Sequence, residues 1–193
     1  MKRSLYAASV ILLTSITWAS VPAKTHVDFA SDSGNTEFVA VGHPSALKIH
    51  GKGPAPQGEL TLAATRIKGT LTFDLASLNT GISMRDHHMK EKYLEVGKYP
   101  RATLRISRIQ LSTPLPSGDF KLDDIPFEGP LTLHGKTVPV KGTVSLAHAG
   151  SQLLVNASFA LKISDYAIAL PTFAGITMAD EVTVHVEAKA LEN

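Results

Sequence analysis

The chain has 193 residues, of which 44% are hydrophobic and 19% charged, and it contains no cysteine. The absence of cysteine excludes disulfides, thiolate catalysis and thiolate metal sites. A chain of this length can bury enough apolar surface to fold as one domain without disulfides. The sequence shows no Ser-, Pro- or Gly-rich linker and no convincing repeat.

The N-terminal segment, residues 1–23, has the pattern of a secretory signal peptide. A basic start precedes a mostly apolar stretch from Leu5 to Trp18, and Ala23 ends a small-residue cleavage site. The apolar stretch is short for a bilayer span, and no stop-transfer pattern follows it. We therefore expect residues 1–23 to be removed on export and residues 24–193 to form one mature domain, periplasmic or secreted. The alternative is an uncleaved membrane anchor.

Cleavage would also neutralise the chain. It removes Lys2 and Arg3, so the basic residues fall from 19 to 17 and equal the acidic ones. Nucleic acid binding needs a basic surface that neutralises phosphates. A neutral mature domain therefore argues against nucleic acid as a partner.

Period-two alternation of apolar and polar residues dominates the mature chain and predicts strands that each bury one face. Gly51–Gly58, rich in Gly and Pro, is expected to be a loop or a wide turn, and His134–Thr137 a hairpin turn. In the last strand, Val182, Val184 and Val186 are expected to point inward. The predicted strands are Phe38–Val41, Leu47–His50, a strand that starts at Leu60, Gly69–Ala76, Ala102–Leu111, Phe120–Leu122, Phe127–Leu133, Val138–Leu146, Leu153–Ser164 and Val182–Ala190.

The strand Ala102–Leu111 changes parity along its length. Leu104 and Ile106 fall on one face, whereas Ile109 falls on the other. An extra residue in a strand produces such a change, so we expect a β-bulge near Arg108.

Seven or more antiparallel strands at short spacing indicate a sandwich or a closed barrel, and closure would remove the exposed edges of such long strands. The polar and aromatic segment Thr80–Pro100 interrupts the alternation. Within it, Met89, Tyr93 and Val96 share one helix face. With Ser83 as its N-cap, this segment predicts one short helix across the mouth of a barrel.

The same segment carries a family resemblance. TGISMRDHHMKEKYLEVGKYPRATL, residues 80–104, resembles the signature of the YceI-like proteins. FEGPLTLHGKTVPV, residues 127–140, and SDYAIALPTFAGITMADEVTVHVEAKA, residues 164–190, are similar to the family's next hairpin and its closing segment. The resemblance implies an all-β, lipocalin-like antiparallel barrel of about eight strands, mostly periplasmic in the family, that binds a polyisoprenoid lipid or an isoprenoid quinone.

Two departures limit what the resemblance implies. Many members have a His-Ser pair before the first long strand, which residues 35–51 lack. Many also have an arginine near the end of the chain, where Lys162–Ile168 has none and Ala167 stands in a glycine position. The resemblance still implies the fold despite these changes. It does not imply that this chain binds the polar end of the ligand in the same way as other members.

The resemblance implies a hollow barrel. An eight-stranded barrel is just wide enough either to be filled by its own side chains or to hold one slender ligand, and alternation does not distinguish the two cases. We expect no required cofactor and a lumen that takes up ubiquinone or another polyprenyl lipid. The predicted lipid-binding wall residues are Phe73, Met89, Tyr93, Phe127, Phe159, Tyr166, Ile168 and Phe173.

Arg85, Asp86 and His88 match the family's Arg-Asp-x-His pattern. One interpretation places them at the barrel rim, in contact with a quinone carbonyl or a polar lipid head. The other is structural: Asp86 caps the helix start, pairs with Arg85 or orients His88, and the group holds the helix on the rim.

Metal binding and catalysis are not expected. His87 and His88 are adjacent and would point in different directions on a helix, and His134 and His185 are expected to face solvent. The sequence contains no HExxH, no GxSxG and no Gly-rich phosphate loop. The carboxylate pair Asp123-Asp124, near Pro126, is interpreted as part of a turn.

A second class of function fits the same barrel. If the interior is filled, the protein would act as a protein-interaction or stress-response module without a lipid ligand. The sequence leaves open two further interactions: transient contact with a membrane, and formation of a homodimer.

Overall fold

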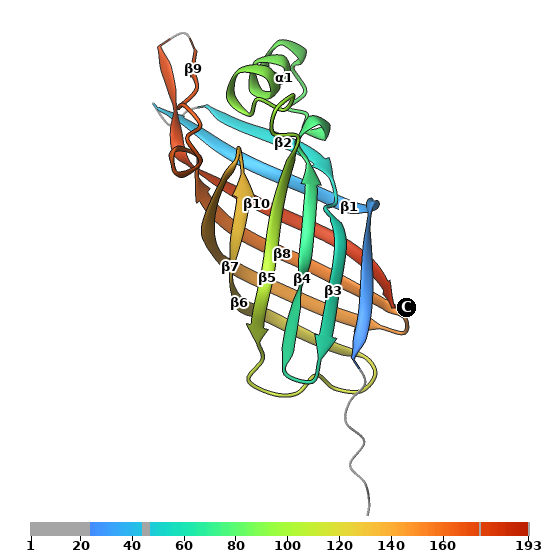
Figure 1. Ribbon diagram of the computed structural model, residues 1–193. Coiled ribbons are helices and arrows are strands. Elements are labelled where there is room, and N and C mark those ends of the chain that lie inside the picture. The colour runs from blue at the N-terminus through green and yellow to red at the C-terminus, as the bar shows by residue number, and fades with distance from the viewer. Residues whose placement is uncertain (1–23, 44–46, 174, 193) are drawn as a thin grey trace, which may run out of the picture.

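The computed structural model describes residues 24–43, 47–173 and 175–192, and most of them lie in one antiparallel sheet that closes into a barrel (Figure 1). The expected signal peptide lies outside the described residues. Along the barrel the strands follow the order β1, β3, β4, β5, β6, β7, β8 and β10, and β10 returns to pair with β1. The predicted eight-stranded, lipocalin-like barrel is therefore confirmed. The eight strands are β1 Thr25–His43, β3 Gln57–Ala63, β4 Arg66–Asp74, β5 Arg101–Gln110, β6 Phe120–Leu133, β7 Lys136–Ala149, β8 Gln152–Lys162 and β10 Ile176–Glu192.

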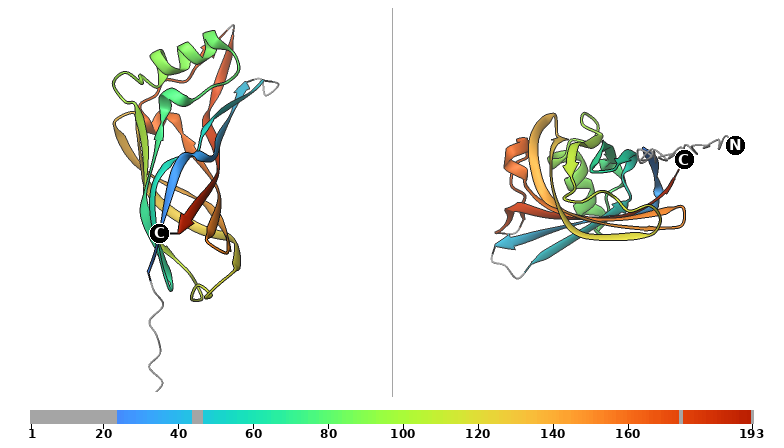
Figure 2. Two further views of the ribbon diagram at one scale, coloured as in Figure 1. Left: turned by 90° about the vertical axis from the view of Figure 1, so that its right-hand side faces the viewer. Right: turned by 90° about the horizontal axis from the view of Figure 1, so that it is seen from below.

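Two short strands extend the sheet at one end of the barrel. β2 (Lys48–Pro54) pairs with the second half of β1, and β9 (Thr172–Phe173) pairs with β10. The first half of β1 pairs with β3 instead, so β2 and β3 follow one another along the same strand. Both extensions reach the end of the barrel where the helix lies (Figures 1 and 2).

The predicted bulge in β5 is confirmed. Ile67 of β4 pairs with Ile109, whereas Gly69 pairs with Ile106, so β5 has one more residue than β4 in this interval. Ile106 and Ile109 are both buried. The bulge therefore turns both isoleucines toward the interior, as their change of parity in the sequence indicates.

The prediction of a loop or a wide turn over Gly51–Gly58 is wrong. β2 continues to Pro54 and β3 begins at Gln57, so only a tight connection separates them. Gly51 pairs with Phe38 of β1, and a Cβ on Gly51 would lie 2.0 Å from the Phe38 ring. The glycine thus makes room for an aromatic ring across the strands, and it does not end the strand.

The interpretation of Asp123-Asp124 as a turn is also wrong. Both lie within β6, where Leu122 pairs with Leu146 and Ile125 with Val144, so this interval contains a bulge. Asp124 adopts a φ of 53° there, and its N–H donates to Ser145 Oγ at 3.2 Å. The two short strands predicted on either side are therefore one continuous strand.

A short helix lies across one end of the barrel (Figure 1). α1 (Ser83–His88) continues into a π-helical turn, η2 (Met89–Tyr93), and a single-turn 3₁₀ helix, η1 (Leu75–Ser77), precedes it. The predicted N-cap at Ser83 is wrong, because Ile82 holds that position and no side chain bonds the helix start. In the described part of the chain, no helix has the length and apolar character needed to cross a bilayer.

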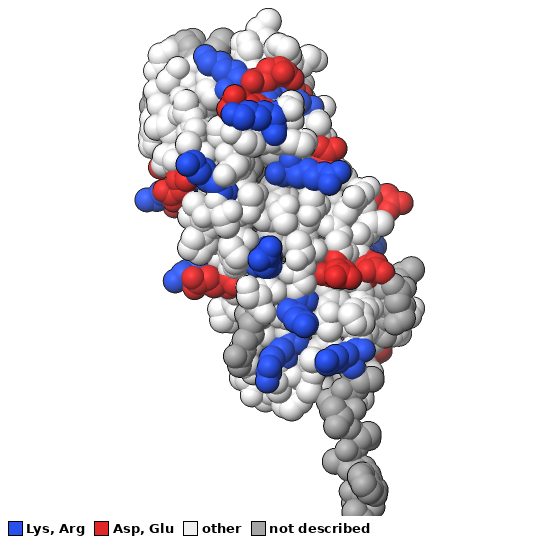
Figure 3. All heavy atoms as spheres, viewed as in Figure 1, with Lys and Arg blue, Asp and Glu red and all other residues white. Residues whose placement is uncertain are grey.

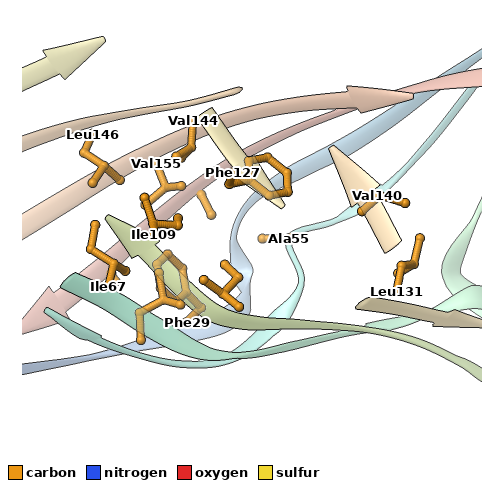
Figure 4. Close-up of a cluster of buried hydrophobic side chains, with 14 of the residues drawn as sticks. Phe29, Ala55, Ile67, Ile109, Phe127, Leu131, Val140, Val144, Leu146 and Val155 are labelled. Atoms are coloured by element: carbon orange, nitrogen blue, oxygen red, sulfur yellow. The ribbon is translucent and has the colours of Figure 1, made fainter. Parts of the chain in front are cut away.

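The opposite end of the barrel is filled with apolar side chains. Val27, Ile67 and Leu153, at the starts of β1, β4 and β8, have relative exposures of 0%, 1% and 0%. In Figure 4 the side chains of Ile67, Ile109, Leu146 and Val155 point toward one another from facing walls. This packing closes the barrel at the end away from α1.

Candidate functional site

The barrel is hollow above this packed end. A cavity of about 670 Å³ extends from Phe29 and Ile67, near the closed end, to Ile82 and Met84 beside α1. Its lining is almost wholly apolar and comes from every barrel strand, because the inward residues of each strand face a common lumen. The polar side chains that border it are Thr36, Thr80, Arg85, His88, Tyr93 and Thr172.

Most of the predicted wall residues border this cavity. They are Phe73, Met89, Tyr93, Phe127, Phe159 and Ile168. Met89 and Tyr93 come from η2, so the predicted helix face does point into the barrel. Phe173 lies in β9, but its side chain is outside the described part of the structure.

Tyr166 occupies a different position from the other wall residues. It lies in η3 (Ile163–Tyr166), the single helical turn that follows β8, and is 1% exposed. It borders a second pocket of about 300 Å³ formed with Pro139 and Ala160, and it is not among the residues that border the main cavity. Burial, with a smaller contribution from Asp165, raises the pKa of Tyr166 to about 12.

Phe127 and Phe159 meet inside the barrel across a glycine. Gly142 of β7 pairs with Phe127 on one side and with Phe159 on the other. A Cβ on Gly142 would lie 2.9 Å from the Phe127 ring, so the absence of a side chain lets the two rings approach. Their centroids are 6.1 Å apart in an edge-to-face arrangement, which aromatic pairs favour.

The predicted inward direction of the last strand is confirmed, since Val182, Val184 and Val186 all border the cavity. The set of predicted wall residues nevertheless missed most of the lining, because it favoured aromatic side chains. The alternation within each predicted strand, which indicates the residues that point inward, was the signal that could have identified the aliphatic lining residues. These residues include Leu71, Leu104, Leu131, Val155 and Leu161.

Arg85 and Asp86 both bind the backbone and hydroxyl of Thr80. Arg85 Nε donates to Thr80 Oγ1 at 2.7 Å, and its Nη2 donates to the Thr80 carbonyl oxygen at 2.7 Å. Asp86, which is buried, accepts from the Thr80 N–H at 2.8 Å and from the Thr80 hydroxyl. These bonds join α1 to the loop before it, so the two residues hold the helix, although through Thr80 and not through His88.

His88 differs from its two neighbours in the motif. It is exposed and borders the cavity, and its ring lies 6.2 Å from that of His87. Within the described residues it has no hydrogen-bond partner of its own. Of the three predicted rim residues, it is therefore the one whose polar atoms are not already engaged by the protein.

His134 does not face solvent, contrary to expectation. It lies in the β6–β7 turn, and its side chain is 10% exposed. Its Nδ1 lies 3.0 Å from the Tyr166 carbonyl oxygen and its Nε2 lies 2.6 Å from Glu95 Oε2, while its ring packs edge-on to Tyr99. His134 thus ties this turn to two segments beside the cavity mouth. His185 is exposed, as expected.

A carboxylate fastens η3 to the last strand. Asp180 of β10 accepts from the Ser164 N–H at 2.9 Å and from Ser164 Oγ at 2.6 Å. These bonds lower the pKa of Asp180 below its usual value. Among the described residues, no group of three or more His, Cys, Asp or Glu side chains is placed to hold a metal ion.

The geometry therefore defines a class: a lipocalin-like barrel with one packed end, one open end and an apolar lumen. The chain belongs to the YceI-like family, whose domain model matches residues 18–190.

Solved structures show the same fold at low identity. A polyisoprenoid-binding domain from Saccharophagus degradans, implicated in plant cell wall breakdown, superposes with a TM-score of 0.64 at 19% identity, over 87% of this chain and 98% of that domain. BcnA from Burkholderia cenocepacia gives 0.61 at 22% identity, over 80% of this chain and 95% of that protein. No curated protein matched the sequence.

Proposed function

We propose that this protein binds a polyisoprenoid lipid or an isoprenoid quinone inside the barrel and carries, stores or sequesters it in the periplasm without covalent chemistry. The observation that carries the proposal is the cavity of about 670 Å³ with an almost wholly apolar lining. Pockets for small molecules commonly measure about 300–1,000 Å³. The structural neighbour whose own name records polyisoprenoid binding adds support at the level of the fold.

The division of the lining into an apolar wall and a polar rim suits such a ligand. Burying hydrocarbon contributes about 0.8 kcal/mol per CH₂, and part of this offsets the cost of ordering a flexible chain. Tail burial would therefore supply affinity, while a few polar groups would set orientation. His88, exposed beside the cavity, is the best-placed candidate for a ligand oxygen at the mouth.

The alternative of a module with a filled interior has less support. It requires side chains to occupy the lumen, whereas the described residues leave the cavity open along the wall from Phe29 to Met84. The alternative would be favoured if crosslinking recovered a protein partner and the purified barrel took up no lipid.

A matched pair of variants on β8 tests the proposal. Ala157 borders the cavity, whereas Ala160, on the same strand, is exposed on the outside. Ala157→Phe places a ring in the lumen, and we expect it to weaken uptake of ubiquinone and of geranylgeraniol at least tenfold. Ala160→Phe, the control, should bind like the wild type.

Native mass spectrometry after mild purification, followed by titration with the two lipids, measures uptake, and circular dichroism checks that both variants are folded. A homogeneous wild-type protein that carries no apolar molecule and takes up neither lipid would sink the proposal. Equal uptake by the two folded variants would also count against binding in this cavity.

A further inference from the structure

The exposed large apolar side chains of this protein gather at one place. Among the described residues there are three of them: Ile82 at 53%, Met84 at 69% and Leu170 at 40% exposure. Ile82 and Met84 border the cavity themselves, and Leu170 lies between Ile168 and Pro171, which also border it. Scattered exposed apolar residues are ordinary, but a cluster at the opening of an apolar cavity marks an interaction surface.

The segment that carries Leu170 has no charge at all. Residues 167–172 read Ala-Ile-Ala-Leu-Pro-Thr, and Ala167, Ala169, Leu170 and Thr172 in it are exposed. The segment leads into β9, at the same end of the barrel as α1 (Figure 1). In Figure 3 the surface over β9 is white, whereas charged side chains are spread over the barrel strands below it.

The segment that carries Ile82 and Met84, residues 82–93, has a small excess of positive charge. Of its two acidic residues, Asp86 is buried and bonded to Thr80, whereas Glu91 is exposed. Its three cations are Arg85, Lys90 and Lys92, so the segment carries one more positive than negative charge. Exposed apolar side chains next to cations are the pattern of a surface that lies in the interface of an anionic membrane.

We propose that the open end of the barrel docks on an anionic lipid bilayer, with Ile82, Met84 and Leu170 inserted between the headgroups and Lys90 and Lys92 facing anionic lipids. This inference rests on the proposed function, because prenyl lipids reside in membranes and reach the cavity from there. A bilayer fits this surface better than a protein partner, since the apolar residues stand at the opening itself. A docked membrane would then be continuous with the lumen.

The test uses vesicles of phosphatidylcholine alone and of phosphatidylcholine with phosphatidylglycerol, without added prenyl lipid. We expect the purified protein to co-sediment with the mixed vesicles at least tenfold more strongly than with the neutral ones, and raised salt to weaken this binding. Leu170→Ser, and Ile82→Ser combined with Met84→Ser, should each reduce it at least tenfold. Leu154→Ser is the control, because this half-buried residue of β8 lies near the closed end and does not border the cavity.

Ubiquinone uptake from detergent solution, measured in parallel, separates this inference from the function on which it rests. Wild-type protein that takes up ubiquinone but ignores both kinds of vesicle overturns the docking alone, and so does equal vesicle binding by every variant. Wild-type protein that takes up neither ubiquinone nor geranylgeraniol overturns the proposed function. Vesicle binding that falls with Leu170→Ser, while ubiquinone uptake from detergent persists, supports docking as a separate step.

Discussion

At the scale of single residues, Tyr166 combines deep burial with an unpaired hydroxyl. Its side chain is 1% exposed, and no described group accepts or donates a hydrogen bond at its Oη. An unsatisfied buried hydroxyl costs about 1–3 kcal/mol. Tyr166 therefore fixes η3 through packing and through its carbonyl oxygen, which His134 contacts, while its hydroxyl opposes stability.

Replacing Tyr166 with Phe should accordingly raise the free energy of unfolding at pH 7 by about 1 kcal/mol. The pH dependence should change as well. Burial raises the pKa of Tyr166 to about 12 in the folded protein, whereas the unfolded chain has the ordinary value of 10.0. Between these values the unfolded state loses the proton first, so wild-type stability falls as pH rises through this window, and that fall should be smaller in Tyr166→Phe.

Urea unfolding at about pH 7, 9 and 11 measures both effects. A loss of more than about 1 kcal/mol in Tyr166→Phe at pH 7 would mean that the hydroxyl has a bonding partner after all. His134→Phe, which keeps a ring against Tyr99, would show what the contacts of His134 with the Tyr166 carbonyl and with Glu95 contribute together.

At the scale of elements, the helix over the mouth depends on one threonine. The hydroxyl of Thr80 receives a bond from Arg85 and gives one to Asp86. Thr80→Val keeps the shape of the side chain but removes both bonds, which involve charged groups that typically contribute about 1.5–3 kcal/mol each. We expect faster amide hydrogen exchange throughout α1 and η2, with the exchange of the barrel strands unchanged.

The matched control is Thr183→Val on β10, whose side chain lies on the face opposite to the inward valines. The same pair of variants decides between the two roles considered for the Arg-Asp motif. If ubiquinone uptake falls in Thr80→Val while exchange in α1 stays as slow as in the wild type, Arg85 and Asp86 act on the ligand, and the interpretation as a tether fails.

How far these elements could be predicted depended on where their determinants lie. The bulge in β5 depends on the order of apolar and polar residues within that one strand, because Ile106 and Ile109 must both face inward. The sequence was therefore sufficient to place it. The strand through Gly51 was missed because this position needs a glycine to make room for the Phe38 ring, which lies on another strand. His134 was misplaced for the same kind of reason, since its partner Glu95 lies 39 residues away.

The candidate site shows the same division. Alternation predicted which way Val184 points, and helical spacing predicted the shared face of Met89 and Tyr93 that borders the cavity. Whether the lumen is open depends on the summed volumes of side chains from every strand, which no single segment contains. The exposed residues at the mouth, Ile82 and Met84, look like ordinary apolar positions until the fold places them beside that lumen.

At the scale of the whole molecule, the barrel separates stability from binding along its axis. Val27 and Leu153 belong to the packed end and do not border the cavity, whereas Ala157, four positions further along β8 than Leu153, does. Four residues of strand span about 13 Å, and changes that far apart usually add independently. The packed end can therefore be weakened without touching the lumen.

Leu153→Ala should lower the free energy of unfolding by about 2–5 kcal/mol, because it leaves a cavity in a fully packed site. At 25 °C the folded variant should still take up ubiquinone like the wild type, since its lumen is intact.

Ligand at 100 times its dissociation constant adds about 2.7 kcal/mol to the free energy of unfolding of a protein that binds it only when folded. Ubiquinone should therefore restore much of the melting temperature lost in Leu153→Ala, and restore little in the double variant with Ala157→Phe. Thermal unfolding with and without ubiquinone measures this, and a folded Leu153→Ala protein that fails to bind would show that the packed end and the lumen act as one unit.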